Sequence, residues 1–519
     1  MFGKTYGSLS SMADAKSAVA ENENSGKVAI LHRVFGALTK RKPFYFLFSL
    51  LTAAVWLPLL GRSFWIDEAC TYWMVHDGFV RAIQKTWHYP GQSPLYSGIA
   101  SLFCFSESPL RDQLLRIPSL IGIALAAYFL YRLAEKRIAH GAGIIAVILF
   151  LLHPNVAAVG YQARPYGLAM AALMGSCWAL CEWEETRSRI YLLWFVVASV
   201  LVIYLHYVFV PIFGMQGLFI LYVFFVDRRR NRWVELAGAA LLIALLCVPL
   251  MRHVLLMVHE RAVLSFNEPP HLFDLTEFLL SSVLVAGLMI VGYLVPKLYP
   301  AATPQQLKMP SSTLFFLMCW WLLAPMLFFV ISRFTQTRPF VPRYLLFTLP
   351  AQALLFGYAG IRLFGFVGGR VWALLGALVF AANPILLLRT PTNTLLPMIQ
   401  FIRSRPADPV FFPSMVFEST FYNWRAGNEP KSWLMAQMTA YPVRNPVYPL
   451  PGIPTSDVPE YINGIIDSKF GDAREVVFVA TTDRWKDFYS DWVTERMQRA
   501  GFHVALHDEG SFTAFIFTR

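Results

Sequence analysis

Residues 44–60 read FYFLFSLLTAAVWLPLL, and residues 61–69 follow directly with GRSFWIDEA. The first run is apolar and uncharged, close to the roughly 20 residues that a helix needs to cross a bilayer. The second run contains Asp67 and Glu68, so two carboxylates stand at the mouth of a membrane segment. Acidic side chains are costly beside hydrocarbon, and their presence there indicates a functional site. A solvated acidic loop is the alternative interpretation.

The composition extends this pattern to the whole chain. Of the 519 residues, 56% are hydrophobic and 15% are charged, and the mean hydropathy is +0.49. A soluble protein could not bury this much apolar surface, so we expect a polytopic α-helical membrane protein with about eleven transmembrane helices. The predicted spans centre near residues 44–60, 115–134, 141–159, 163–181, 190–206, 208–226, 234–251, 277–297, 313–332, 343–363 and 371–388.

Lysine and arginine predict the orientation. They gather in the N-terminal arm, residues 1–42, and in the loops near residues 132–137, 187–189 and 228–232. The positive-inside rule makes these segments cytoplasmic. The net charge of +12 then reflects topology and attraction to anionic lipid, not a nucleic-acid partner. The polar first forty residues lack the apolar core of a secretory signal peptide. We expect an integral plasma (inner) membrane protein with a cytoplasmic N-terminus.

The tail has a different character from the rest of the chain. An odd number of spans places residues 389–519 outside the cytoplasm, after a transmembrane domain of residues 43–388. Strand-like runs at 475–480, 502–506 and 512–517, with a helical pattern at 484–500, predict a small α/β extracytoplasmic domain. The six cysteines read mainly as small core residues, and a bridge between Cys70 and Cys104 stays open.

Polar residues recur in the segments predicted to face outward. The long first loop, residues 61–113, adds Lys85, His88, Gln92 and Tyr96 to the two carboxylates, and later turns contribute Gln162, Arg164, Tyr166, His206 and Arg343. Arg164 and Arg343 border apolar helices on the side that the positive-inside rule disfavours, so each requires a partner. A phosphate suits a guanidinium group. The alternatives are snorkelling or an internal ion pair with Asp67 or Glu68. His206 reads either as a phosphate hydrogen-bond donor or as a polar residue that fills a helix turn.

Five strings resemble one family when taken in order. They are WIDEA at 65–69, QSPLY at 92–96, RIPS at 116–119, QARPY at 162–166 and PRYLL at 342–346. Together, over residues 44–363, they resemble the GT-C membrane glycosyltransferases, in the protein O-mannosyltransferase-like branch that includes bacterial lipopolysaccharide-sugar and aminoarabinose transferases. The resemblance implies a GT-C-like catalytic domain in the cell envelope. It also implies sugar transfer from a polyprenyl-phosphate donor on the extracytoplasmic face.

The resemblance also implies roles for individual residues. Asp67 is the candidate base with Glu68 beside it, and Arg164 and Arg343, with His206 and Tyr166, are candidates for binding the lipid phosphate. Candidates for contacts to donor or acceptor sugar are Lys85, His88, Gln92, Tyr96 and Gln162. Many relatives carry Glu at the position of Gln162, which puts in doubt a second acidic role and any metal site there. No metal ligand is therefore assigned, and assistance by a divalent metal stays open.

The chemistry of the residues agrees with that role. A carboxylate within about 3 Å of an acceptor hydroxyl can take its proton as the oxygen attacks the anomeric carbon. Fixed arginines can stabilise a departing lipid phosphate, and a base without a partnered nucleophile favours single displacement with inversion. The rival hypotheses are a transporter or flippase for lipid-linked sugars and a non-catalytic assembly subunit. The sequence leaves open the sugar, the acceptor (glycan, lipid or protein), the role of the C-terminal domain and the oligomeric state.

Overall fold

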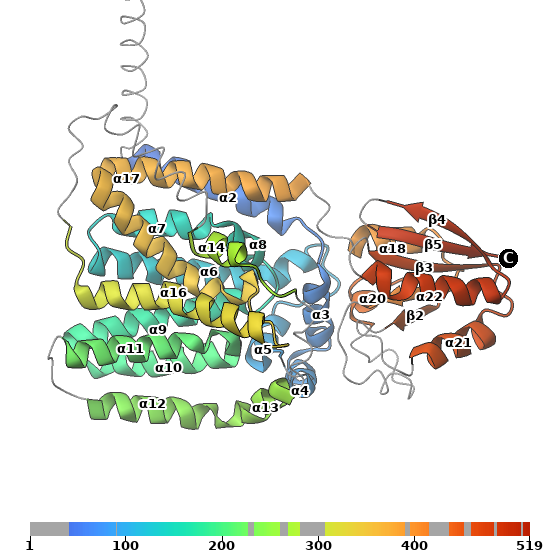
Figure 1. Cartoon of the computed structure of the whole chain (residues 1–519), viewed down its shortest axis with the longest axis horizontal. Coiled ribbons are helices and arrows are strands. Elements are labelled where there is room, and N and C mark those ends of the chain that lie inside the picture. Colours follow the sequence, from blue (N-terminus) through green and yellow to red (C-terminus); the bar gives the residue numbers. More distant parts are fainter. Residues whose placement is uncertain are drawn as a thin grey trace, which may run out of the picture.

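The computed structural model describes the chain in ten segments. These are residues 41–89, 91–226, 233–259, 268–280, 307–389, 395–414, 435–450, 458–481, 485–509 and 512–519. The predicted N-terminal arm lies almost wholly outside them. A large body of helices is joined at one end to a smaller domain that contains a sheet (Figure 1).

The body consists of apolar helices that lie side by side. They are α2 (Arg41–Leu60), α6 (Arg111–Arg137), α7 (Ala142–Leu151), α8 (Pro154–Gly160), α9 (Tyr166–Thr186), α10 (Arg189–Leu205), α11 (Pro211–Phe225), α12 (Trp233–Cys247), α13 (Met251–His259), α14 (Leu272–Leu280), α16 (Ser311–Phe334) and α17 (Leu349–Arg389). Within the described residues, five helical stretches are long and apolar enough to cross a membrane. A sixth is added if α7 and α8, bent by 64°, form one span. These are the helices of an integral membrane protein, whereas the predicted count of about eleven stays a prediction.

Two predicted spans form one interrupted element. The runs at 343–363 and 371–388 fall largely in α17, which breaks at Gly365 with φ 67° and ψ −179°. This backbone conformation is essentially confined to glycine, because a Cβ atom would clash with the backbone there. Gly365 therefore allows the chain to change direction within α17, in the gap between the two predicted spans. The predicted span at 277–297 lies mostly outside the described residues.

Three short helices occupy the end of the body next to the C-terminal domain (Figure 1). They are α3 (Ile66–Val75), α4 (Phe79–His88) and α5 (Pro94–Ser101), and all three come from the long first loop. Helix α5 begins where Ser93 Oγ accepts a hydrogen bond from the Tyr96 amide at 2.9 Å and Pro94 takes the first helical position. The Ser93 hydroxyl also donates to the Tyr204 carbonyl at 2.7 Å, which fixes α5 to the end of α10.

Helices α6 and α9 approach each other closely at two glycines. A Cβ atom on Gly122 would meet the Gly167 backbone, and one on Gly167 would meet the Ser119 carbonyl. Small residues allow this approach of two membrane helices. Ser119 also donates a hydrogen bond to the Arg164 carbonyl at 2.8 Å. The contact therefore sets the position of the turn that precedes α9.

We predict that Gly167→Ala destabilises the protein by about 1–3 kcal/mol, because the added methyl group meets backbone that cannot rotate away. Gly214→Ala on α11 is the matched control, since its Cβ would enter open space. It should leave stability unchanged or raise it by up to about 1 kcal/mol. Thermal unfolding of the detergent-purified protein measures both changes. A Gly167→Ala variant as stable as wild type would contradict the close contact.

The described strands of the C-terminal domain form a five-stranded sheet of order β2-β1-β3-β5-β4. Strand β1 pairs in parallel with β2 and β3, whereas β5 pairs antiparallel with β3 and β4. The elements are α18 (Leu395–Arg403), β1 (Val410–Pro413), α20 (Ala436–Ala440), β2 (Val447–Leu450), α21 (Val458–Lys469), β3 (Glu475–Thr481), α22 (Trp485–Arg499), β4 (His503–Asp508) and β5 (Phe512–Thr518).

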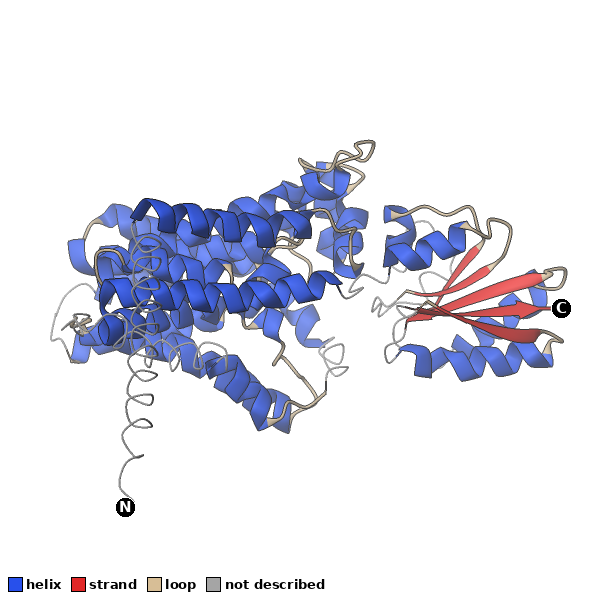
Figure 2. Cartoon of the chain, turned by 90° about the horizontal axis from the view of Figure 1, so that it is seen from above, coloured by secondary structure: helices blue, strands red, loops and turns tan. Residues whose placement is uncertain are grey.

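Helices cover both faces of this sheet (Figure 2). Along β3, Val477 and Val479 face the core shared with α18 and α20, whereas Val476 and Phe478 face the core shared with α21 and α22. A strand buried on both faces reads as an unbroken apolar run, which explains why the sequence predicted β3. The predicted strands and helix coincide with β3, β4, β5 and α22 to within a few residues.

The C-terminal domain is held to the helical body through polar contacts beside α3. The Tyr441 hydroxyl accepts a hydrogen bond from the Phe64 amide at 2.7 Å and donates one to Asp112 Oδ2 at 2.8 Å. Arg111 Nη1 donates to the Ala440 carbonyl at 2.8 Å. These bonds tie α20 to the segment that leads into α3 and to the start of α6.

Candidate active site

Asp67 lies at the start of α3 beside two arginines from distant parts of the chain. Arg343, in the 3-10 turn Pro342–Tyr344, places Nη1 3.2 Å from Asp67 Oδ2. Arg164, in the turn before α9, donates to Gln92 Oε1 at 3.1 Å and makes a longer contact of 3.4 Å with the Asp67 carbonyl. The side chain of Asp67 is 26% exposed. The structure thus brings together Asp67, Gln92, Arg164 and Arg343, all of them site candidates from the sequence.

Several nitrogen atoms around Asp67 are buried without a protein partner. Within the described part of the chain, Arg164 Nε, Arg343 Nε, His206 Nδ1 and Trp65 Nε1 have no hydrogen-bond acceptor or donor opposite them. Leaving a buried polar group unpaired costs about 1–3 kcal/mol, and more when the group is charged. Such a concentration at one place indicates a ligand with oxygen atoms that would satisfy these groups. We refer to Asp67, Arg164, His206 and Arg343 as the cationic cluster.

Aromatic rings surround the cationic cluster. The Tyr166 ring lies against His206 with 4.8 Å between centroids, and His206 stacks on Phe209 at the same separation. The Arg343 guanidinium lies 5.4 Å from the centre of the Tyr344 ring and 5.8 Å from that of Trp65. These rings bury part of the cluster, although Asp67 and Arg343 stay 26% exposed, so its charges act through a lower dielectric than at an open surface. Tyr166 therefore joins the predicted phosphate-binding residues in space.

The electrostatics favour an anion. Burial first, and then the charges of Arg164 and Arg343, lower the pKa of His206 to about 3, so the imidazole is neutral near pH 7. Burial opposes the charge on both arginines, but the Asp67 carboxylate raises the pKa of Arg164 and of Arg343. Two permanent cations beside one carboxylate leave an excess of positive charge. The cluster can therefore accept a phosphate group.

Glu68 has a different environment from its neighbour. Arg116 Nε and Nη2 donate to its two carboxylate oxygens at 2.7 and 2.8 Å, and both side chains are buried. The Ala163 amide donates to Glu68 Oε1 at 2.8 Å, and the Trp65 amide donates to Oε2 at 3.3 Å. Both oxygens of Glu68 are thus engaged inside the protein, away from the cationic cluster.

Arg116 is a site residue that sequence reasoning left without a role. Besides Glu68, it donates to the carbonyl groups of Leu60 and Arg62 at 2.9 and 2.7 Å, and makes a longer contact of 3.3 Å with that of Ser63. It therefore fixes the whole segment between α2 and α3. The sequence contains a feature that could have identified it: Arg116 is a cation at the start of an apolar helix, like Arg164 and Arg343.

The remaining candidates have other contacts. The Lys85 amine binds Asp77 Oδ2 at 2.7 Å and the Trp73 carbonyl at 2.8 Å, at the far end of α3. The Tyr96 hydroxyl hydrogen-bonds Ser119 Oγ at 3.1 Å, which supports the Arg164 turn. Gln162 donates to the Ala158 carbonyl at 2.8 Å, one helical turn away. His88 ends α4, and its side chain lies outside the described residues.

Neither the cysteines nor the acidic residues form a further centre in the described segments. Cys70 and Cys104 are both free thiols, so the bridge left open by the sequence is not present. No group of three or more His, Cys, Asp and Glu side chains among the described residues is arranged to hold a metal ion.

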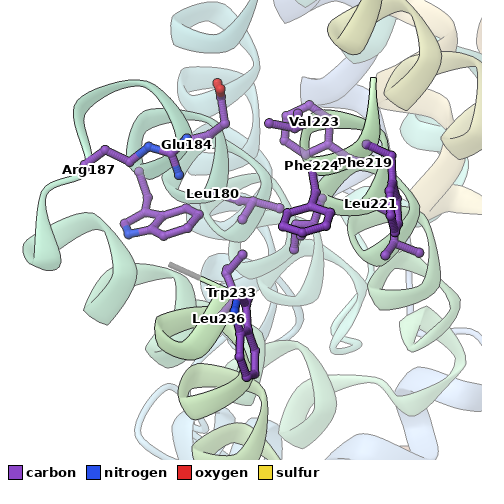
Figure 3. A pocket seen from close by; sticks show the side chains of 12 residues that line it. Leu180, Glu184, Arg187, Phe219, Leu221, Val223, Phe224, Trp233 and Leu236 are labelled. Carbon is purple, nitrogen blue, oxygen red and sulfur yellow. The ribbon is translucent and has the colours of Figure 1, made fainter. Parts of the chain in front are cut away.

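An apolar cavity of about 430 Å³ lies at the opposite end of α9. Its walls are made by Leu180 and Trp183 of α9, Phe219 and Phe224 of α11, and Trp233 and Leu236 of α12 (Figure 3). Trp183 is 17 residues after Tyr166, so about 25 Å of helix separate this cavity from the cationic cluster. The cavity is therefore not part of the candidate active site.

Comparison with known proteins gives the family context. Residues 94–253 match the family model for dolichyl-phosphate-mannose-protein mannosyltransferases. The fold is similar to that of ArnT from Cupriavidus metallidurans bound to undecaprenyl phosphate, with TM-score 0.57, 12% identity, and coverage of 92% of this chain and 98% of that one. The apo state of the same protein gives TM-score 0.54 and 12% identity over 91% of this chain and 97% of that one. The predicted resemblance to the GT-C membrane glycosyltransferases is confirmed. No curated protein sequence matches.

The match to the family model covers only part of the cationic cluster. The matched segment runs from α5 to α13 and contains Arg164 and His206. Asp67 and Arg343 lie outside it, on either side. The similarity of fold to ArnT covers 92% of this chain, well beyond the segment that the family model matches.

Proposed function

We propose that this protein transfers a sugar from a polyprenyl-phosphate donor to an acceptor at the end of the helical body that carries α3, α4 and α5. The observation that carries the proposal is the cationic cluster, in which buried nitrogen atoms without partners lie beside a partly exposed carboxylate. The similar structure of ArnT holds undecaprenyl phosphate, which supports a donor of that class. The lysine and arginine bias of the loops supports an extracytoplasmic position for this end.

In this proposal the two arginines hold the phosphate of the donor. Arg164 and Arg343 approach Asp67 from separate elements, Arg164 at its backbone carbonyl and Arg343 at its carboxylate. Each of the two arginines has a buried Nε without a partner in the described structure. A phosphate that lies between them would accept hydrogen bonds from both. His206 is neutral and would contribute one further hydrogen bond through Nδ1. The cations stabilise the departing phosphate most as it gains charge, because they are held in place before the reaction.

Asp67 is the base in this proposal. The acceptor oxygen forms a bond to the anomeric carbon, its proton passes to the Asp67 carboxylate, and the carbon–oxygen bond to phosphate breaks with its electron pair on the phosphate. Glu68 is excluded from this step because both of its oxygens are engaged by Arg116, Ala163 and Trp65. Asp67 is the one carboxylate of the cationic cluster, and no nucleophile is paired with it among the described residues, so the expected result is inversion at the anomeric carbon.

Arg343→Leu is expected to weaken binding of undecaprenyl phosphate at least about tenfold, because one of two phosphate-facing cations is lost while Asp67 stays. Arg343→Lys should retain part of the affinity, since it keeps the charge but not the planar fork. Binding of radiolabelled undecaprenyl phosphate to the protein in nanodiscs measures both. Arg499→Leu, an exposed arginine paired with Glu495, is the matched control. Equal affinity in wild type and Arg343→Leu would remove Arg343 from the phosphate site.

The function itself is tested by transfer. Purified protein would be incubated with a panel of radiolabelled polyprenyl-phosphate sugars and with cell-envelope extract as acceptor. The expected outcome is label in an acceptor, with the released lipid phosphate in equal amount. Wild-type protein that binds these donors but never transfers label would contradict the proposal and favour a transporter or an assembly subunit.

A further inference from the structure

The apolar cavity in Figure 3 has no part in the proposed reaction. Its walls come from one end of three helices: residues 180–187 at the end of α9, residues 219–225 at the end of α11 and residues 233–236 at the start of α12. Helix α12 packs mainly against α10, and the cavity is the space that remains between α12 and α11. Its volume of about 430 Å³ lies within the range of about 300–1,000 Å³ that ligand pockets occupy.

The cavity opens onto an apolar surface of the helical body. Leu221 and Phe225 of α11 and Trp233 of α12 line it, and each is more than half exposed. In the most apolar 18-residue window of the stretch Trp233–Leu256, only 11% of the residues are buried inside the protein, so lipid surrounds most of α12 in a membrane. Water gains no hydrogen bonds from apolar walls, and an acyl chain therefore fills such a space in preference to water.

Charged and aromatic side chains indicate where the lipid headgroups lie. Arg187 caps the end of α9 and Arg189 begins α10, and this bias toward arginine supports a position in the cytoplasmic leaflet. Trp233 begins α12 at the same end with an exposed ring, and tryptophan is enriched at the level of the headgroups. Leu180 and Phe219 line the cavity further from this end of their helices. A lipid in the cavity would therefore place its headgroup beside Arg187 and its chain toward Leu180 and Phe219.

Arg187 lines the cavity with a guanidinium group that has no acidic partner in the described structure. Its charge lies over the Trp183 ring, 5.0 Å from the ring centre, and its side chain makes no hydrogen bond with a described residue. Glu184 is the other charged residue of the wall, but it pairs with Arg137 Nη2 at 3.3 Å. In Figure 3 the Glu184 carboxylate points away from the apolar side chains. Guanidinium binds phosphate oxygens at two points, so a lipid phosphate complements Arg187.

The backbone of Arg187 is also unusual. Its φ of 58° and ψ of 19° are left-handed, and no other non-glycine residue in the described part of the chain has a positive φ. Glycine is the usual residue at such a position after a helix, because any Cβ atom makes this conformation costly. A charged side chain held in a costly conformation indicates a function for that side chain.

We propose that the apolar cavity binds a phospholipid of the cytoplasmic leaflet, with one acyl chain between α11 and α12 and the phosphate on Arg187. The walls bury the chain, and Arg187 supplies the charge that distinguishes a phospholipid from a neutral lipid. The bound chain would join α12, which packs mainly against α10, to α11. This site is separated from the cationic cluster by about 25 Å of helix α9, and it does not depend on sugar transfer there.

Two substitutions test the cavity, and each has a matched control. Leu236→Trp fills the cavity from α12, whereas Leu242→Trp adds the same bulk at an exposed position of α12 that does not line it. Arg187→Gln removes the charge at the mouth of the cavity, whereas Arg189→Gln removes a charge two residues further on, at an exposed position outside it. Thermal unfolding of each detergent-purified variant shows that it is folded. Should Leu236→Trp not fold, the Arg187→Gln pair still decides.

Lipid binding is measured by native mass spectrometry of delipidated protein. The two probes are phosphatidylglycerol and a diacylglycerol with the same acyl chains, which lacks the phosphate. We expect wild type to bind phosphatidylglycerol at least about tenfold more tightly than diacylglycerol, as for charge-assisted hydrogen bonds to one group. Leu236→Trp should weaken the binding of both lipids at least about tenfold. Arg187→Gln should weaken phosphatidylglycerol alone and remove its advantage, and both control variants should match wild type.

Four results would overturn the proposal. The first is wild-type protein that retains no phosphatidylglycerol, and the second is equal affinity in wild type and Leu236→Trp. The third is an equal loss in Arg187→Gln and Arg189→Gln, which would show general attraction to basic residues and not a phosphate site at Arg187. The fourth is displacement of phosphatidylglycerol by undecaprenyl phosphate, which would identify a polyprenyl chain as the occupant of the cavity.

Discussion

Asp67→Asn is expected to lower the rate of sugar transfer at least about 10²-fold, which is the lower end of what a positioned general base contributes. The amide keeps the shape of the side chain but cannot take the proton of the acceptor hydroxyl. Binding of undecaprenyl phosphate should be equal to or tighter than in wild type, because Arg343 Nη1 loses its carboxylate partner at 3.2 Å. Transfer and binding are measured on the same preparation. A loss of transfer without a loss of undecaprenyl-phosphate binding would separate proton transfer from phosphate binding.

The control for this prediction is a second aspartate next to the same helix. Asp77 follows α3 and pairs with Lys85 at 2.7 Å, and Asp77→Asn should leave transfer within a few-fold of wild type. If Asp67→Asn transfers at the wild-type rate, the base must be another group, although the phosphate site could still stand. If both variants lose transfer equally, the effect lies in the stability of α3 and not in proton transfer.

Arg116→Met is expected to destabilise the protein by about 3–5 kcal/mol, the usual cost of leaving one partner of a buried ion pair without the other. Glu68 would stay buried with two hydrogen bonds from backbone amides and no cation. The carbonyl groups of Leu60 and Arg62 would each lose a donor. Thermal unfolding and the yield of folded protein after detergent extraction measure the loss.

A double-variant cycle separates the ion pair from the packing of each residue. Glu68→Gln alone and Arg116→Met alone should both be destabilising, and the double variant should be less destabilised than the sum of the two. Strict additivity would show that the two side chains act independently, in conflict with hydrogen bonds of 2.7 and 2.8 Å between them. Undecaprenyl-phosphate binding by folded Glu68→Gln should stay near wild type, since Glu68 does not reach the cationic cluster.

Local patterns were sufficient where local physics decides structure. The apolar run at 115–134 lies within α6, because a helix that crosses a bilayer needs apolar residues along its length. The run at 475–480 lies within β3, because a strand that is buried on both faces needs apolar residues at successive positions. Strands β1 and β2 were not predicted. Each is four residues long, and the proline in each weakens a strand pattern. The break at Gly365 falls in the gap between the predicted spans 343–363 and 371–388, so the sequence located this change of direction.

The candidate site shows where sequence reasoning ends. The sequence by itself determined that carboxylates and arginines gather at helix ends, since charge beside hydrocarbon is costly and is therefore informative wherever it occurs. The family resemblance named Asp67 as the candidate base, but the sequence offered no physical reason to separate it from Glu68, the next residue in the chain. On a helix, successive side chains point about 100° apart, so the two carboxylates face different neighbours. Arg343 reaches Asp67 across 276 residues and Arg116 reaches Glu68 across 48. Only the packing of distant helices decided which carboxylate is enclosed in an ion pair and which stays open to a substrate.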